Sequence, residues 1–155
     1  MTPRQALLAG WFVAAFAGLV WVKGHYVFET NLSGSLPGIF YWVKLGEPVP
    51  RGGLALFPAP PGNPEFREDF VKIVQGLGGD LVERRDGVVF VQGVEIGRLL
   101  EKTSKGHVLI PGPTGVIPEG FAFVRGTHAR SYDSRYGEIG FIPVSQFRGR
   151  AYQLL

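Results

Sequence analysis

The 155-residue chain contains no cysteine, so neither a disulfide framework nor a thiolate metal site is available to it. It also lacks a strong excess of one charge, since 16 Lys and Arg stand against 13 Asp and Glu, a formal net charge of +3. That charge would suit an anionic membrane surface, but it is too weak and too scattered to indicate a nucleic-acid partner. No internal repeat is present, and the length suits one domain.

Glycine and proline are, by contrast, abundant, at 23 and 12 residues. They predict many turns and few long helices, which favours an all-β domain. Asp86-Gly87 and Gln92-Gly93 are typical of tight turns between strands, with a further strand after the second turn. Residues 98–106 are polar and are expected to be exposed. Short apolar, β-branched or aromatic runs predict antiparallel strands, at residues 38–43, 54–57, 69–74, 81–83, 88–91, 108–110 and 121–124.

One long uncharged run, residues 6–22, is at the short end of what spans a bilayer as a helix. It has two interpretations. Ala15-Phe16-Ala17 resembles the cleavage site of a signal peptide, but apolar residues continue beyond it, which favours a permanent signal anchor. In both cases the rest of the chain crosses the membrane. We therefore divide the chain into a tail and transmembrane anchor, residues 1–23, and an extracytoplasmic domain, residues 24–155.

Three polar clusters follow the anchor. In the first, residues 31–38, Pro37 favours an extended or turned backbone, and Gly34 lets that backbone pass close to another group. A serine in such a segment can present its hydroxyl, although ordinary loops have the same composition.

In the second cluster, Lys72 lies within an apolar, strand-like run. Most strand lysines point to water, but a buried lysine has a lowered pKa, and a neutral lysine beside a serine is a general base. The Gly-x-Gly-Gly-Asp sequence that follows lacks the dinucleotide fingerprint, so it does not indicate a phosphate loop. In the third cluster, residues 126–137, Asp133 and Arg135 could form an ion pair.

These clusters together resemble type I signal peptidases, the Ser–Lys peptidases of family S26. The resemblance is carried by Ser-Gly-Ser-Leu-Pro, by Asp-Phe-Val-Lys with Gly-x-Gly-Gly-Asp, and by Ser-Tyr-Asp-Ser-Arg-Tyr-Gly, in the family's order and rough spacing. The small size and the Pro-Gly-Ile-Phe-Tyr sequence are more similar to the conjugative-transfer maturation peptidases of TraF type. Leu36 replaces the family's usual methionine, Gly78 replaces a proline, and His128 stands where an asparagine or another polar residue is common.

The resemblance implies a catalytic dyad with Ser35 as nucleophile and Lys72 as general base. Ser131 matches a serine that orients the lysine. The supporting residues implied in the same way are Ser33, whose hydroxyl would help the Ser35 N–H form an oxyanion hole; Asp133 and Arg135, which would brace the active-site loop; and Val71, which would line a pocket for small substrate side chains.

The implied function is that of a membrane-bound serine endopeptidase that cleaves signal or pro-peptides from exported proteins, a conjugative pilin among them. Its expected partners are a preprotein or prepilin substrate and membrane lipid, with no nucleic acid, no cofactor and no metal. The expected location is the bacterial inner (cytoplasmic) membrane, with the catalytic domain on the periplasmic side. The expected fold is an antiparallel signal-peptidase-like β domain with one N-terminal transmembrane helix.

Other functions remain open at this stage. The domain could be a catalytically silent binding module of a secretion or pilus-assembly complex. A Ser–His–Asp hydrolase using His128 and Asp133 is disfavoured, because nothing places that histidine in a known orienting geometry. A self-cleaving Ser–Lys repressor is disfavoured by the apolar N-terminal run, since those proteins resemble soluble DNA-binding proteins.

Overall fold

The N-terminal run forms one helix that stands apart from the rest of the chain. The computed structural model describes residues 2–30, 34–60 and 68–154, and α1 covers Pro3–His25. Thr2 and Gln5 form a reciprocal capping box at its start, which satisfies two free N–H groups of the first turn. At about 1.5 Å per residue, its 23 residues extend over roughly 35 Å, and its length and composition suffice to cross a membrane.

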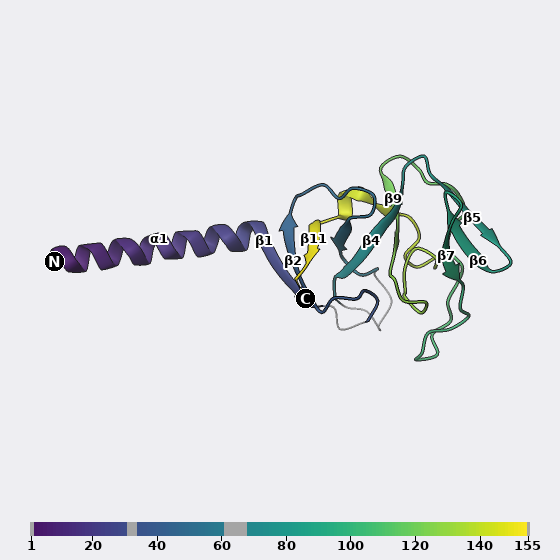
Figure 1. Ribbon diagram of the computed structural model, residues 1–155, viewed down its shortest axis with the longest axis horizontal. Helices are drawn as coiled ribbons and strands as arrows, with labels where there is room; N and C mark the ends of the chain where they lie inside the picture. Colours follow the sequence, from purple (N-terminus) through teal and green to yellow (C-terminus); the bar gives the residue numbers. More distant parts are fainter. Residues whose placement is uncertain (1, 31–33, 61–67, 155) are drawn as a thin grey trace.

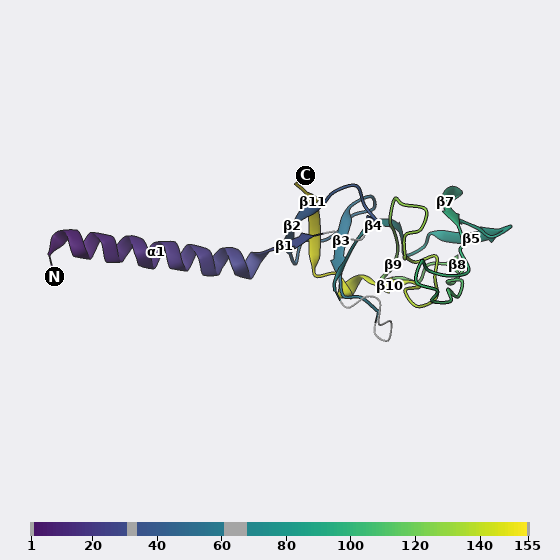
Figure 2. The same ribbon diagram turned by 90° about the horizontal axis from the view of Figure 1, so that it is seen from below.

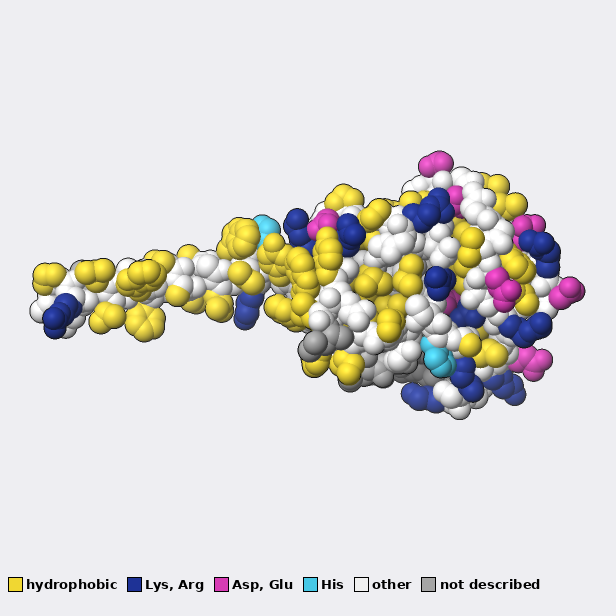
Figure 3. All heavy atoms as spheres, viewed as in Figure 1, with side chains coloured by type: hydrophobic (Ala, Val, Ile, Leu, Met, Phe, Trp, Pro, Cys, Tyr) yellow, Lys and Arg dark blue, Asp and Glu magenta, His cyan; other side chains and the backbone are white. Residues whose placement is uncertain are grey.

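Large apolar side chains are exposed along the length of α1, from Leu7 to Val22, and Figure 3 shows them on the face in view. None of its most apolar 18-residue window is buried against the domain, and Figure 1 shows it extending away as an isolated rod. The apolar surface continues onto the adjoining end of the domain, where Phe28, Ile39 and Phe40 are exposed. A helix of this kind needs an apolar environment outside the protein, such as lipid.

The remainder is built from two antiparallel sheets. In the described part of the chain, the larger has seven strands in the order β1-β2-β11-β3-β4-β9-β10 and the smaller has four in the order β7-β6-β5-β8. Figures 1 and 2 place the smaller sheet at the end of the domain opposite α1. The strands are β1 Tyr26–Thr30, β2 Phe40–Leu45, β3 Leu54–Phe57, β4 Phe70–Leu77, β5 Leu81–Arg85, β6 Val88–Val91, β7 Val94–Arg98, β8 Gly115–Val116, β9 Phe121–Arg125, β10 Ile142–Pro143 and β11 Gly149–Gln153, with the 3-10 turn η1 at Val144–Gln146.

The predicted fold class, an antiparallel all-β domain behind one apolar helix, is confirmed. The strand predicted at residues 108–110 is wrong, because Val108 makes only an isolated bridge with Lys102. Gly106 and Pro111 bound that run so closely that no ladder can extend. The sequence analysis missed β1 and β11, although β11 lies between β2 and β3 in the larger sheet.

The two sheets are tied together at Asp80, which ends the glycine turn after β4. Its buried carboxylate accepts hydrogen bonds from the Leu77 N–H (2.8 Å) and the Gln92 side-chain amide (2.9 Å), and it pairs with Arg51. The hydrogen bond from Arg51 is the main reason that the pKa of Asp80 falls to about 2. This turn therefore uses its carboxylate to join three loops rather than to bind a phosphate.

Replacing Asp80 with Ala should lower the free energy of unfolding by about 1.5–3 kcal/mol, because hydrogen bonds to a charged acceptor are lost. Since folding depresses this pKa, the contribution is complete above about pH 4 and disappears as the pH falls through about 2. Melting of the full chain in detergent micelles measures the loss. Glu83→Ala, which breaks the exposed pair with Arg85, is the control and should cost under about 1 kcal/mol; equal losses in the two variants would contradict the assignment.

Candidate functional site

Lys72 is buried in the middle of β4. Alternation along the strand places it on the same face as Phe70 and Val74, and its register partner on β3 is the small residue Ala55. Only 3% of Lys72 is exposed. The sequence left open whether this lysine points to water or to the interior, and the structure places it in the interior.

The amine of Lys72 has one polar contact among the described residues. Its Nζ donates a hydrogen bond to the Ser131 Oγ at 3.1 Å and lies 5.3 Å from the centre of the Phe70 ring. Burial lowers the pKa of Lys72 from 10.5 to about 8, partly opposed by the nearby Asp133 carboxylate and assisted by Arg135. A substantial fraction of this amine is therefore neutral at mildly alkaline pH, as a general base requires.

Ser35 is anchored through its own carbonyl group and through the residues that follow it. Leu36, which follows it, is buried in an apolar cluster with residues of β2, β3, β4 and β11, and the Gly38 N–H donates to the Tyr41 hydroxyl at 3.0 Å. The Ser35 carbonyl accepts a hydrogen bond from the Thr127 N–H at 2.8 Å. That bond joins the serine segment to the loop that contains Ser131.

The loop of residues 126–137 is organised by a buried ion pair between Asp133 and Arg135. Two hydrogen bonds, of 2.8 and 3.0 Å, join the guanidinium to the carboxylate, and the two side chains are 0% and 2% exposed. The guanidinium also donates to the carbonyls of Ser131 (2.9 Å) and Ala129 (3.2 Å). The ion pair that the sequence allowed is thus present, and it fixes the backbone on which Ser131 stands.

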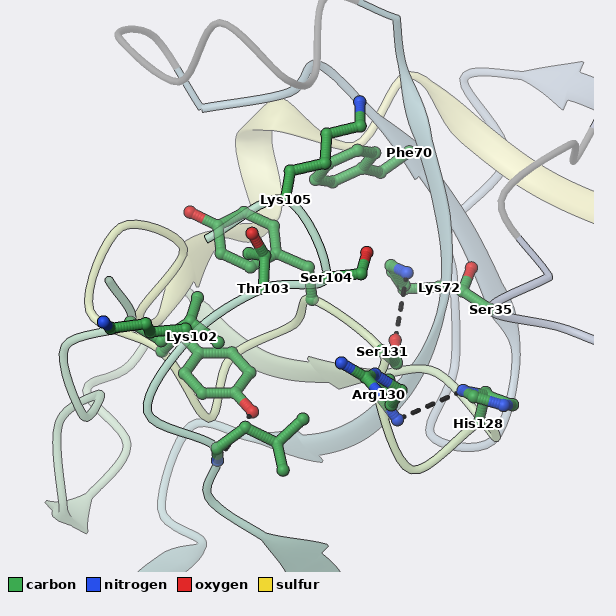
Figure 4. A pocket seen from close by; sticks show the side chains of 14 residues that line it. Ser35, Phe70, Lys72, Lys102, Thr103, Ser104, Lys105, His128, Arg130 and Ser131 are labelled. Carbon is green, nitrogen blue, oxygen red and sulfur yellow. Dashed lines mark hydrogen bonds between the residues drawn. The ribbon is translucent and has the colours of Figure 1, made fainter. Parts of the chain in front are cut away.

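Ser35, Lys72 and Ser131 line one cavity of about 650 Å³, shown in Figure 4. The sequence analysis missed its opposite wall, which comes from the loop after β7. The isolated bridge between Lys102 and Val108 and the 2.6 Å contact of His107 with Glu138 hold that loop in place. The other lining residues are Phe70, Leu100, Lys102, Thr103, Ser104, Lys105, Leu109, His128, Arg130, Tyr132 and Tyr136.

The structure does not test the roles predicted for Ser33 and Val71. Ser33 lies outside the described residues. Val71 points to the opposite face of β4 from Lys72, where it packs with Leu36 and Leu56, and it is not among the described residues that line the cavity. Its predicted place in a substrate pocket stays a prediction.

The contacts of His128 do not support a Ser–His–Asp arrangement. His128 is exposed, and its Nδ1 accepts from the Arg130 N–H at 3.1 Å. Both oxygens of Asp133 are engaged by Arg135, and one also accepts from the Gly126 N–H at 3.2 Å. The described residues also contain no group of three or more His, Asp or Glu placed to hold a metal ion.

The chain matches the family described as signal peptidase, peptidase S26, over residues 4–154. It is 33% identical to the conjugal transfer protein TraF of Agrobacterium fabrum, over 80% of each chain. It is 28% identical to the signal peptidase I of Bacillus caldolyticus, over 90% of this chain and 85% of the relative. The crystal structure of a signal peptidase I from Enterococcus faecalis aligns over 65% of this chain and 94% of that one, with 28% identity and a TM-score of 0.42.

Replacing Lys72 with Met should stabilise the protein below about pH 8, where the buried amine is protonated at a cost of about 3 kcal/mol. Between the folded pKa of about 8 and the ordinary 10.5, the unfolded wild type binds more protons, so its own stability rises with pH and the advantage of Met shrinks. Melting of both proteins across this range measures the difference. Exposed Lys105, replaced by Met, is the control; a Lys72→Met advantage that does not change with pH would contradict burial of the amine.

Proposed function

The chain belongs to the signal peptidase family, peptidase S26, and we propose that it is a serine endopeptidase in which Ser35 is the nucleophile and Lys72 the general base. Family membership gives it a peptidase-type role, and together with α1 it indicates a single-pass membrane protein. One observation carries the finer proposal. The Lys72 amine is buried and hydrogen-bonded to Ser131 in a cavity that Ser35 also lines.

In the proposed reaction, the neutral Lys72 amine accepts the proton of Ser35 as the Ser35 Oγ attacks the scissile carbonyl carbon. The resulting ammonium then gives this proton to the leaving amine, the peptide C–N bond breaks, and an ester with Ser35 remains. Water attacks that ester by the same proton route, which releases the acid and restores the serine. The Ser131 hydroxyl keeps the Lys72 amine directed at its target throughout.

The oxyanion of each tetrahedral intermediate needs two donors close to Ser35. The resemblance assigns them to the Ser35 N–H and the Ser33 hydroxyl, and that assignment stays part of the proposal. Asp133 and Arg135 are positioning residues, because they act through the backbone of Ser131. Their opposite charges partly cancel at Lys72, which leaves burial as the main influence on its pKa.

The proposed substrates are exported proteins that carry a signal or pro-peptide. The similarity to a conjugal transfer protein favours a pilin precursor among them. We place α1 in the bacterial inner membrane and the domain on the periplasmic side, in contact with lipid. The exposed apolar residues beside α1 support a position of the domain close to the bilayer surface.

Ser35→Ala should abolish cleavage, and Lys72→Ala should lower kcat by about 10²- to 10⁴-fold, because the proton acceptor is lost. Lys72→Arg should fail as well, since a guanidinium stays protonated at any relevant pH. His128→Ala is the control and should keep most of the activity. The assay incubates the full chain in detergent with candidate preproteins and identifies products by mass.

Two results would overturn the proposal. If Lys72→Ala cleaves normally and His128→Ala does not, a conventional triad is the better account. If wild type and Ser35→Ala are both inert toward every preprotein but bind the same protein partner, the domain is a binding module.

Gly126→Ala should impair the same reaction without unfolding the domain. A Cβ at this position would collide with the Ser131 side chain and lie 2.7 Å from the Ser35 carbonyl oxygen, so the Ser131 side chain and the Ser35 backbone would both have to move. A misplacement of about 1 Å in these groups should lower kcat/KM by roughly tenfold to a hundredfold. Gly24→Ala, where the added Cβ meets nothing within 4 Å, is the matched control, and equal activity of the two variants would contradict the tight packing at Gly126.

A further inference from the structure

The cavity that contains Ser35 and Lys72 has a cationic rim, formed by Lys102, Lys105 and Arg130. All three are exposed, and no carboxylate is found among the described residues that line the cavity. Other cations of the domain, such as Arg51 and Arg148, are paired with carboxylates, whereas none of the three rim cations has an ion pair with a described residue. Their charge is therefore available to a ligand in the cavity.

The rim is carried by ordered backbone on two sides of the cavity, as Figure 4 shows. On one side, Lys102 and Lys105 stand on a turn closed by backbone hydrogen bonds between Thr103 and His107 (2.8 Å) and between Gly106 and Thr103 (3.0 Å). On the other side, Arg130 directly precedes Ser131, the hydrogen-bond partner of Lys72. A ligand in this cavity would therefore lie between the cations of the rim and the proposed nucleophile, which lines the same cavity.

Three like charges around the mouth of a low-dielectric cavity attract anions and repel cations. Ammonium and guanidinium groups make their strongest hydrogen bonds to carboxylates and phosphates. A lipid phosphate is the less favoured ligand, because the rim turn follows β7, and Figure 1 shows β7 at the end of the domain away from α1. Aromatic walls from Phe70 and Tyr132 suit a peptide, which brings apolar and charged groups together.

We propose that this rim selects peptide substrates that bear a carboxylate close to the scissile bond. The inference rests on the proposed function, because it takes the cavity as the substrate site. A peptide carboxylate has two sources, the side chain of Asp or Glu and the C-terminus. Both would be attracted by the charge of the same three cations, and a basic residue at the same place would be repelled.

The test uses the full chain in neutral detergent and fluorogenic peptides in which a single Glu is moved through each position around the cleaved bond. Each peptide is compared with its Gln counterpart, and both are made with a free and with an amidated C-terminus. At one or more positions, wild type should show a kcat/KM about fivefold higher for Glu, for the free C-terminus, or for both, and the preference should shrink as salt is raised. Lys102→Gln, Lys105→Gln and Arg130→Gln should each reduce it about two- to fivefold.

Arg84→Gln, the same charge change on the exposed surface of β5, is the control and should leave the preference intact. Binding of the same peptides to Ser35→Ala, followed by fluorescence anisotropy, keeps the test independent of cleavage. If the wild type cleaves none of the peptides but Ser35→Ala still binds the carboxylate peptides preferentially, only the proposed function is contradicted. Equal binding of the Glu and Gln peptides and of the free and amidated ends would overturn the inference. So would a preference that survives in a triple variant in which Lys102, Lys105 and Arg130 are all replaced by Gln. The inference would also be overturned if this triple variant kept the peptide preference and lost only its binding to anionic lipid vesicles.

Discussion

The amine of Lys72 is buried inside a small β domain, and the neighbouring strands and loop make that burial possible. The strand alternation of β4 turns the side chain away from water, Phe70 and Val74 flank it, and Ala55 leaves space for its aliphatic stem. Because a protonated amine is poorly solvated there, the neutral form is favoured. The Ser131 hydroxyl supplies the polar contact that directs the amine.

Ser131 can serve in this way only if its loop is rigid. The loop obtains its rigidity from the ion pair of Asp133 and Arg135, whose polar atoms are occupied by each other and by backbone groups. Such a pair gives little net stability, since both charges lose their hydration, but removing one partner would leave the other buried and unpaired. The pair is therefore better understood as fixing one conformation of the loop than as a source of stability. Through Thr127 the same loop also holds Ser35.

The sequence was sufficient for the features that depend on local pattern. The β3 and β6 strands and the tight turns on either side of β6 could be predicted, because strand-forming residues and turn residues report directly on the backbone. The burial of Lys72 could not be decided, since it depends on β3 and β9 packing beside β4. The strand β11 was missed because Ala151 is its one fully buried apolar side chain.

The wall of the cavity that is formed by the loop after β7 also could not be predicted from the sequence. Residues 98–106 looked like an ordinary exposed polar loop, and only contacts made far along the chain, such as that of His107 with Glu138, place it opposite Ser35. Long-range contacts of this kind leave no periodic signal in the local sequence. A function can be assigned to a loop of that composition only when the fold shows which residues lie opposite it.

The protonation of Lys72 is the point at which this account is most directly testable. The full chain with isotope-labelled lysine can be titrated in detergent micelles by NMR, with the Lys72 signal assigned by its loss in Lys72→Arg. We predict a midpoint near 8, lowered by burial from the ordinary lysine value of 10.5. A Lys72 midpoint at that ordinary value would contradict the account, because almost none of the amine would then be neutral even at mildly alkaline pH, and it could not act as the base.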